Sequence, residues 1–193
     1  MPSADSFPTA ATADWGDFDL SAAQGVLDEA LKGADDGEIF IEKRETESLV
    51  YDDRRLKSAG YGADQGFGFR VVAGATIGFA NSAELSVDAV RRAAEAAVLA
   101  KQGKAVDIAL KHDNPTRSNQ RYYQAHDPLG EMEFADKIAL LQAIDAYARD
   151  RHPDVVQVSA SLAAEKRAIT ILRGEGQVYH DYRPLVRLSI GVS

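Results

Sequence analysis

DQGFGFRVVAGATIGFANS, residues 64–82, is the stretch that decides the fold of this chain. Between Gly66 and Ala73 the apolar side chains occupy every second position, which is the period of a strand that buries one face. Residues 76–80 repeat that alternation after Gly74. The pattern predicts a hairpin whose turn, Ala73-Gly74-Ala75, uses the freedom of glycine to adopt positive φ.

Two glycines stand opposite the aromatic face of the first of these strands. Gly66 and Gly68 leave their side of the sheet bare, and Arg70 follows on the same side. A second backbone, such as that of a peptide, could approach closely there. The alternative is that the glycines only relieve crowding under a helix, in which case Gly68→Val should disturb packing against the alanine-rich helix predicted at 86–102.

Composition limits the classes of protein that remain. The chain has 193 residues, a net charge of −8 and no cysteine, so disulfides and thiolate metal sites are excluded. There is no basic stripe for nucleic acid, no apolar run of membrane-spanning length and no secretory signal at the start. We therefore expect a cytoplasmic protein with neither nucleic acid nor membrane as partner. Residues 1–17 are expected to form a flexible tail.

The remaining sequence alternates between helical and extended periods. Helices are predicted from Ser21 to Gly33, from Ser86 to Gly103 and from Glu133 to Arg149, with Ser21 and Ser86 as caps. Residues 38–81 read as a five-stranded antiparallel meander, and four more strands follow between residues 155 and 192.

This order of elements predicts an α+β fold of the sandwich type, in which antiparallel meanders pack with helices. We expect two helix-plus-meander units, at about 18–103 and 133–193, joined by a connector at 104–132 and with the second unit truncated. The last apolar strand would then be unpaired, which indicates a piece of a longer protein. The alternative is a complete protein in which Val192 lies on a protected edge.

The histidines do not form a recognisable metal motif. His112, His126, His152 and His180 share no helical face, and none is followed by glutamate. Three of them precede an aspartate, and metal-bound histidines often have a carboxylate partner. A zinc site needs three or four convergent ligands, so we predict no metal-binding, cofactor-binding or catalytic residue in this chain.

Two arginines on predicted strands have two possible roles. Arg70 and Arg187 each lie beside apolar residues and could neutralise the carboxylate of a peptide. The alternative is that each pairs with an acidic residue of the sheet, because buried charges are normally paired.

Several segments together resemble the TldD/PmbA family, once called modulators of DNA gyrase, and its TldD branch in particular. The resemblance is carried by RRLKSAGYGADQGFGFRVV (54–72), ATIGFANS (75–82) and the alanine-rich helix that follows, and further by FADKIALLQAIDAYARD (134–150), VVQVSASLA (155–163) and YRPLVRLSIGV (182–192).

That resemblance implies zinc metallopeptidases that trim or degrade small unfolded peptides. An amino-terminal α/β domain shapes a closed chamber, and a later β-rich domain carries the zinc motif His-Glu-x-x-x-His, whose glutamate acts as base for a metal-activated water. Two members, one active and one inactive, pair into a dimer. This sequence lacks the motif, so no catalytic residue can be carried over, the zinc is expected downstream, and the chain should be inactive alone.

Two functional hypotheses follow. In the first, the chain is the amino-terminal domain of a TldD-type zinc peptidase, which walls the chamber, forms the dimer contact and holds an extended peptide. In the second, it is a non-catalytic module that binds peptide or protein, as a free adaptor or as part of an inactive partner subunit. A downstream His-Glu-x-x-x-His beyond Ser193 would favour the first. The negative net charge of the chain disfavours DNA binding.

Overall fold

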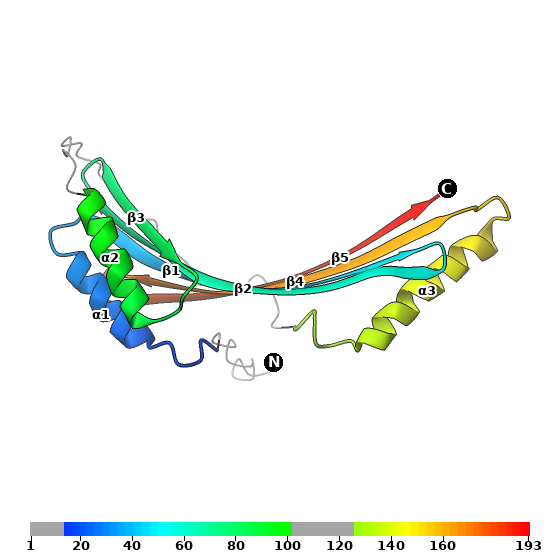
Figure 1. The fold of residues 1–193 in the computed structure, drawn as a ribbon, viewed down its shortest axis with the longest axis horizontal. Helices are drawn as coiled ribbons and strands as arrows, with labels where there is room; N and C mark the ends of the chain where they lie inside the picture. The colour runs from blue at the N-terminus through cyan, green and yellow to red at the C-terminus, as the bar shows by residue number, and fades with distance from the viewer. Residues whose placement is uncertain (1–13, 102–125) are drawn as a thin grey trace, which may run out of the picture. The chain divides into compact units, whose positions relative to one another are not determined.

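A computed structural model describes residues 14–101 and 126–193 of the chain (Figure 1). In these residues three helices accompany five strands. The helices are α1 (Leu20–Ala30), α2 (Val87–Lys101) and α3 (Phe134–Arg151), and a single 3-10 turn, η1 (Gly174–Gly176), lies between the last two strands. The strands are β1 (Asp36–Asp52), β2 (Arg55–Ala73), β3 (Thr76–Ser82), β4 (Val158–Arg173) and β5 (Gln177–Val192).

All five strands belong to one sheet, in the order β3-β2-β1-β4-β5. The α+β class with antiparallel strands packed against helices is confirmed. The predicted number of strands is wrong, because nine expected strands correspond to five longer ones. β1 continues through Thr46, since charged residues there have partners on neighbouring strands: Arg44 forms an ion pair with Glu165, and Glu45 accepts a hydrogen bond from the Tyr61 hydroxyl.

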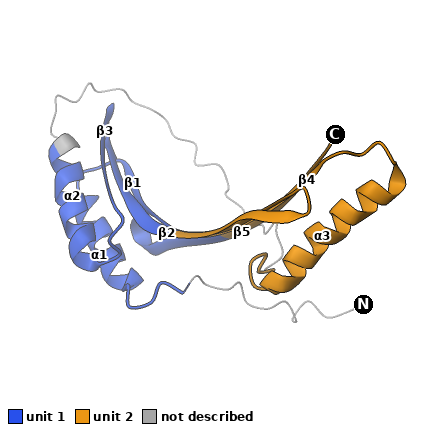
Figure 2. Cartoon of the chain, turned by 45° about the vertical axis from the view of Figure 1, so that its right-hand side comes forward, with its two compact units in different colours: residues 1–43, 64–122, 168–181 blue, residues 44–63, 123–167, 182–193 orange. Residues whose placement is uncertain are grey.

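Contacts divide the described residues into two compact units (Figure 2). Unit 1 contains residues 14–43, 64–101 and 168–181, and unit 2 contains residues 44–63, 126–167 and 182–193. Each of the four long strands contributes to both units. The two units therefore interleave along the chain.

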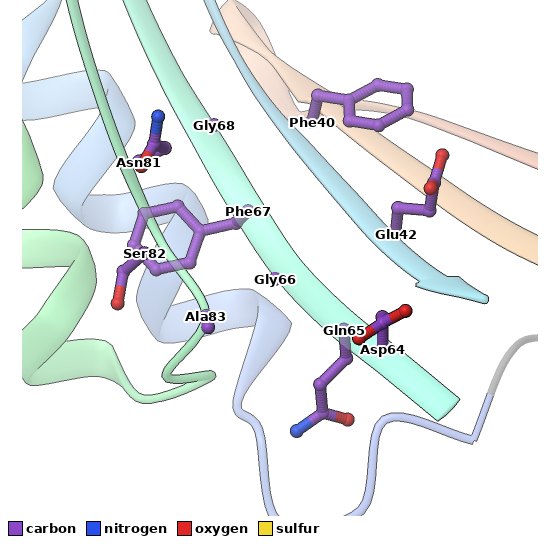
Figure 3. A pocket seen from close by; sticks show the side chains of 10 residues that line it. All are labelled: Phe40, Glu42, Asp64, Gln65, Gly66, Phe67, Gly68, Asn81, Ser82 and Ala83. Carbon is purple, nitrogen blue, oxygen red and sulfur yellow. The ribbon is translucent and has the colours of Figure 1, made fainter. Parts of the chain in front are cut away.

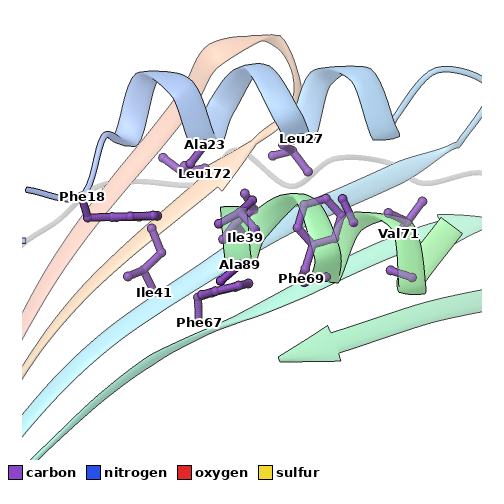
Figure 4. Packing of buried hydrophobic residues seen from close by; sticks show 14 residues of the cluster. Phe18, Ala23, Leu27, Ile39, Ile41, Phe67, Phe69, Val71, Ala89 and Leu172 are labelled. Atoms are coloured by element: carbon purple, nitrogen blue, oxygen red, sulfur yellow. The ribbon is translucent and has the colours of Figure 1, made fainter. Parts of the chain in front are cut away.

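Unit 1 is built around an apolar core between the sheet and two helices (Figure 4). Alternation along the strands directs Ile39, Phe69 and Val71 to this side, and all three are fully buried. α1 contributes Leu27 and α2 contributes Val90, each without solvent exposure. Burying a side chain of this size stabilises a fold by about 1.5–3 kcal/mol, so this cluster is the main source of stability in unit 1.

The beginning of the described chain is also held by this unit. Trp15, which we had assigned to the flexible tail, donates its indole N–H to the Thr170 hydroxyl over 3.0 Å and packs against the core. The first helix is capped by Asp19, whose carboxylate accepts the Ala22 N–H at 2.9 Å, and not by Ser21. Residues 1–13 of the predicted tail lie outside the described residues.

Helix α2 approaches β3 very closely. Its predicted cap is confirmed, because the Ser86 hydroxyl accepts the Ala89 N–H at 3.1 Å. Gly78 of β3 faces the helix, and a Cβ atom added there would lie 1.8 Å from the carbonyl oxygen of Ala97. Glycine at this position is therefore required by the approach of two backbones.

Unit 2 has a smaller apolar core and several buried charges. Leu49, Tyr51, Leu141 and Ala160 form its cluster. Along α3, Leu141 is fully buried, whereas Phe134 is 49% exposed.

Two charged residues of α3 are buried, although the pattern of apolar residues in the sequence did not indicate burial at these positions. Lys137 is 4% exposed and donates to Glu47 Oε2 at 2.7 Å and to the Leu129 carbonyl at 2.6 Å. Asp145 is equally buried and accepts from Arg149 at 3.2 Å. Pairing of this kind is what allows a charge to stay inside a protein.

Candidate functional site

A groove of about 370 Å³ lies in unit 1 on strands β1, β2 and β3 (Figure 3). It contains Gly66 and Gly68, two of the three residues we predicted as a place of backbone approach. The lining residues are Phe40, Glu42, Asp64, Gln65, Gly66, Phe67, Gly68, Asn81, Ser82 and Ala83.

Strand alternation explains why the floor of this groove is bare. Phe67 and Phe69 point into the helix-covered core, so the glycines between and before them face the other side. Gly68 is opposite Asn81 in the register of β2 and β3. Its missing Cβ leaves room for the exposed ring of Phe79, which a side chain there would approach to 3.2 Å.

The predicted contact between helix α2 and the two bare glycines is wrong. The alanines of α2 pack with Phe67 and Phe69 on the opposite side of β2, and the glycine that lets α2 approach is Gly78. Gly66 has a different neighbour, since a Cβ atom there would lie 2.7 Å from the Ser82 carbonyl oxygen. Part of the glycine pattern thus serves the packing of β3 on β2.

Arg70, the third predicted residue, does not line the groove. Its guanidinium contacts Asp36 Oδ2 and Glu38 Oε1, each at 3.3 Å. Of the two roles the sequence allowed, pairing within the sheet is therefore the one the structure shows. Burial alone raises the pKa of Asp36, but the hydrogen bond and charge of Arg173, the Gly37 N–H and the charge of Arg70 together hold that pKa below its usual value.

The polar groups of the groove suit an extended chain that carries its own N–H donors. Glu42 and Asp64 supply carboxylates, Gln65 and Asn81 supply amides, and Phe40, 37% exposed, supplies an apolar wall. Phe40 could have been found from the sequence. It stands between Ile39 and Ile41, which are both fully buried, so period two assigns it to the open face.

The histidines do not converge. His126 Nδ1 lies 2.8 Å from Glu131, His152 lies 3.7 Å from Asp154, and His180 Nδ1 lies 2.9 Å from the Thr170 hydroxyl. His112 lies outside the described residues. Across residues 14–101 and 126–193, no three histidine, cysteine or acidic side chains are grouped so that they could hold a metal ion.

None of the helices in the described part of the chain is both long and apolar enough to span a membrane.

The described fold, one antiparallel sheet with helices on one face of each unit, has clear relatives. Residues 37–101 match the family model for PmbA/TldA metallopeptidase domain 1, and residues 127–193 match that for the PmbA/TldA metallopeptidase central domain. The chain belongs to the TldD/PmbA family.

Curated relatives support this assignment. The chain is 33% identical over 162 residues to the metalloprotease TldD homolog of Buchnera aphidicola subsp. Schizaphis graminum, covering 82% of this chain and 32% of the relative. It is 32% identical over 165 residues to the Haemophilus influenzae homolog, covering 83% and 33%. The chain thus spans about a third of the length of these relatives.

Solved structures share the fold at lower identity. A protein described as a candidate modulator of DNA gyrase from Bacteroides thetaiotaomicron superposes with a TM-score of 0.68 at 16% identity, covering 92% of this chain and 41% of the other. TldE from Thermococcus kodakarensis superposes with a TM-score of 0.61 at 16% identity, covering 90% and 40%.

Proposed function

We propose that this chain forms a non-catalytic portion of a TldD-type zinc metallopeptidase. In this proposal it walls a chamber, contributes to the contact with a TldD/PmbA-type partner subunit and holds an extended, unfolded peptide in the cytoplasm. The observation that carries the proposal is the match of two family domains, in order, to a metallopeptidase family. The groove of unit 1 supports the third role, because it combines exposed backbone, amides and carboxylates with one aromatic wall.

The zinc that the family implies has no fitting ligand set among the residues the structure describes. We therefore assign no step of hydrolysis to these residues. Metal-activated water would belong to a further domain carrying His-Glu-x-x-x-His, and the part of this chain would be to bind and orient the peptide. Main-chain hydrogen bonds to the peptide would make that binding tolerant of sequence.

Peptide binding by the chain tests this proposal. A short unstructured peptide with a fluorescein label should bind, as measured by fluorescence anisotropy, without being cleaved. Phe40→Ala should weaken binding roughly fivefold, because part of the apolar wall is removed. Leu56→Ala is the matched control, since Leu56 is 38% exposed against 37% for Phe40 and lines neither this groove nor the second one described below.

Absence of peptide binding, or equal effects of Phe40→Ala and Leu56→Ala, would contradict the assignment of this groove. The coding sequence beyond Ser193 provides a separate test. A downstream His-Glu-x-x-x-His supports a peptidase subunit, and a longer chain that lacks the motif supports the alternative of an inactive partner.

A further inference from the structure

A second groove, of about 500 Å³, lies in unit 2 on strands β1, β2, β4 and β5. The alternation of β1 directs Leu49 and Tyr51 toward α3, so Thr46 and Ser48 face the opposite side of the strand. The groove therefore opens on the face of unit 2 that α3 does not cover. The lining residues are Arg44, Thr46, Glu47, Ser48, Gly60, Tyr61, Gly62, Ala163, Ala164, Glu165, Leu185 and Arg187.

The floor of this second groove consists of small side chains and hydroxyls. A Cβ atom added to Gly62 would meet Thr46 Oγ1 at 3.0 Å, and one added to Gly60 would meet Ser48 Oγ at 3.3 Å. Ala163 of β4 continues the floor. A ligand lying here can therefore approach the sheet backbone closely and find hydroxyl groups beside it.

The carboxylates that line the groove are already engaged by cations. Glu165 Oε2 contacts Arg44 Nη2 at 2.5 Å, and its Oε1 contacts Arg167 Nε at 2.5 Å. Burial raises the pKa of Glu165, but the hydrogen bonds and charges of Arg167 and Arg44 hold that pKa below its usual value, so the group is ionised at neutral pH. Glu47 uses its Oε2 to accept from Lys137 at 2.7 Å.

Arg187 differs from these residues because the described part of the chain offers it no carboxylate partner. Its Nε donates to the Ser189 hydroxyl at 3.2 Å, and no acidic side chain of the described residues lies within ion-pair distance. The charged side chains that line the groove are two arginines, Arg44 and Arg187, and two glutamates, Glu47 and Glu165. Both lining carboxylates are therefore neutralised by cations, and Arg187 is the lining cation left without a carboxylate in the described part of the chain.

An apolar side chain lies beside the Arg187 guanidinium. Leu185 lies two residues before Arg187 on the same face of β5 and is 62% exposed. Arginine presents a planar set of donors that matches a carboxylate in bidentate geometry. The combination of a guanidinium with no carboxylate partner in the described residues, an adjacent apolar side chain and an accessible backbone is suited to a peptide that carries a carboxylate.

We propose that the unit 2 groove binds the carboxylate of an extended peptide through Arg187, while Leu185 contacts an apolar side chain of the same peptide. This inference rests on the proposed function, since it assumes that the chain binds peptides. The carboxylate can be the peptide's C-terminus or an acidic side chain, and the experiment below separates these two sources.

Three labelled peptides of one neutral, partly apolar sequence serve as probes in anisotropy titrations. The first has a free C-terminal carboxylate, the second a C-terminal amide, and the third an amide together with one internal glutamate. The first or the third should bind roughly tenfold more tightly than the second, which is typical for a charge-assisted hydrogen bond. The advantage should decrease as salt is added.

Variants of the full chain then assign the effect to the groove. Arg187→Gln should remove the advantage, and Arg187→Lys should retain part of it, because lysine keeps the charge but not the bidentate fork. Arg55→Gln is the matched control: it makes the same charge change at an exposed residue of unit 2 outside the groove, and should leave all three affinities unchanged. Thermal denaturation of each variant establishes that the fold is retained.

The outcomes distinguish failure of the carboxylate site from failure of the proposed function. If all three peptides bind equally to the natural chain, or if Arg187→Gln leaves the advantage intact, the carboxylate site is wrong and the proposed function stands. If no peptide binds at all, the proposed function fails and this inference fails with it. Should Arg187→Gln not fold, the comparison of the three peptides on the natural chain still tests whether a carboxylate is recognised.

Discussion

The two units of this chain cover one face of their part of the sheet by different physical means. In unit 1, helices α1 and α2 bury aliphatic and aromatic side chains such as Leu27 and Phe69, and α2 approaches β3 to backbone contact. In unit 2, α3 buries few apolar groups and instead places Lys137 and Asp145 inside, each with an ionic partner. The comparison teaches that the same sheet strands can be stabilised by apolar burial at one end and by paired charge at the other.

The open faces differ in charge as well. The groove of unit 1 is lined by Glu42 and Asp64 and by no basic residue, whereas that of unit 2 is lined by two arginines and two glutamates, of which Arg187 has no carboxylate partner among the described residues. An extended peptide with a free amino group suits the first, and one with a carboxylate suits the second.

Removing the central aromatic side chain of unit 1 should have the largest effect. Phe69 is fully buried, so Phe69→Ala loses apolar burial and leaves a cavity, at a cost of about 3–5 kcal/mol. Chemical denaturation measures the free energy of unfolding, and hydrogen exchange should show the loss of protection in α1 and α2 before α3. Phe79→Ala is the control, since Phe79 is 58% exposed and should cost less than about 1 kcal/mol. Equal losses for both would mean that burial does not dominate in unit 1.

Breaking the buried ion pair of unit 2 should come second. Lys137→Met leaves Glu47, whose side chain is 16% exposed, without its cation, which should cost about 3 kcal/mol. The double variant Lys137→Met with Glu47→Leu should recover most of the loss, because the unpaired charge is then removed too. Hydrogen exchange should show the effect in α3. A double variant no more stable than the single one would mean that pairing is not what holds α3.

Two glycine substitutions compare the covered and open faces directly. Gly78→Ala should destabilise the chain by about 1–3 kcal/mol, because the added methyl overlaps the Ala97 carbonyl oxygen and a backbone must move. Gly68→Ala should cost less than about 1 kcal/mol, since its neighbour is the exposed ring of Phe79, which can rotate away. Thermal denaturation measures the loss of stability in each variant. A larger loss for Gly68→Ala than for Gly78→Ala would contradict the packing of α2 against the face of β3 that Gly78 occupies.

The smallest effect should be a change in pH dependence. Glu165 has a pKa below its usual value in the folded chain, so its contribution to stability is fully present above the pKa of the unfolded state, about 4.3, and is lost as the pH falls through the folded value. Glu165→Gln should therefore flatten the stability profile below about pH 5. An unchanged slope would show that the Arg44 and Arg167 contacts do not stabilise unit 2.

The sequence predicted local features more accurately than long-range ones. The Ser86 cap and the Gly74 turn, with φ of 56°, were predicted because each depends only on neighbouring residues. The long continuous strands were missed, because the partners that sustain β1 at Arg44 and Glu45 are distant in sequence: Glu165 of β4 forms an ion pair with Arg44, and the Tyr61 hydroxyl of β2 donates a hydrogen bond to Glu45. The buried Lys137 was missed for the same reason, since only the position of Glu47 makes it acceptable.

The candidate grooves were predictable in part. Period two along β2 correctly assigned Gly66 and Gly68 to the face opposite the phenylalanines, and those glycines line the first groove. The period-two pattern could not show whether Arg70 or Arg187 would form an ion pair with a carboxylate, because that depends on which strands are neighbours in the sheet. β1 brings Asp36 and Glu38 to Arg70, whereas Arg187 on β5 receives no carboxylate in the described part of the chain.

One measurement tests the central claim most directly: titration of the purified chain with a labelled unfolded peptide, followed by mass spectrometry of the peptide after prolonged incubation with added zinc. Our account predicts saturable binding, an intact peptide, and an affinity that a chelator does not change. Cleavage of the peptide by this chain, or the absence of any binding, would contradict it.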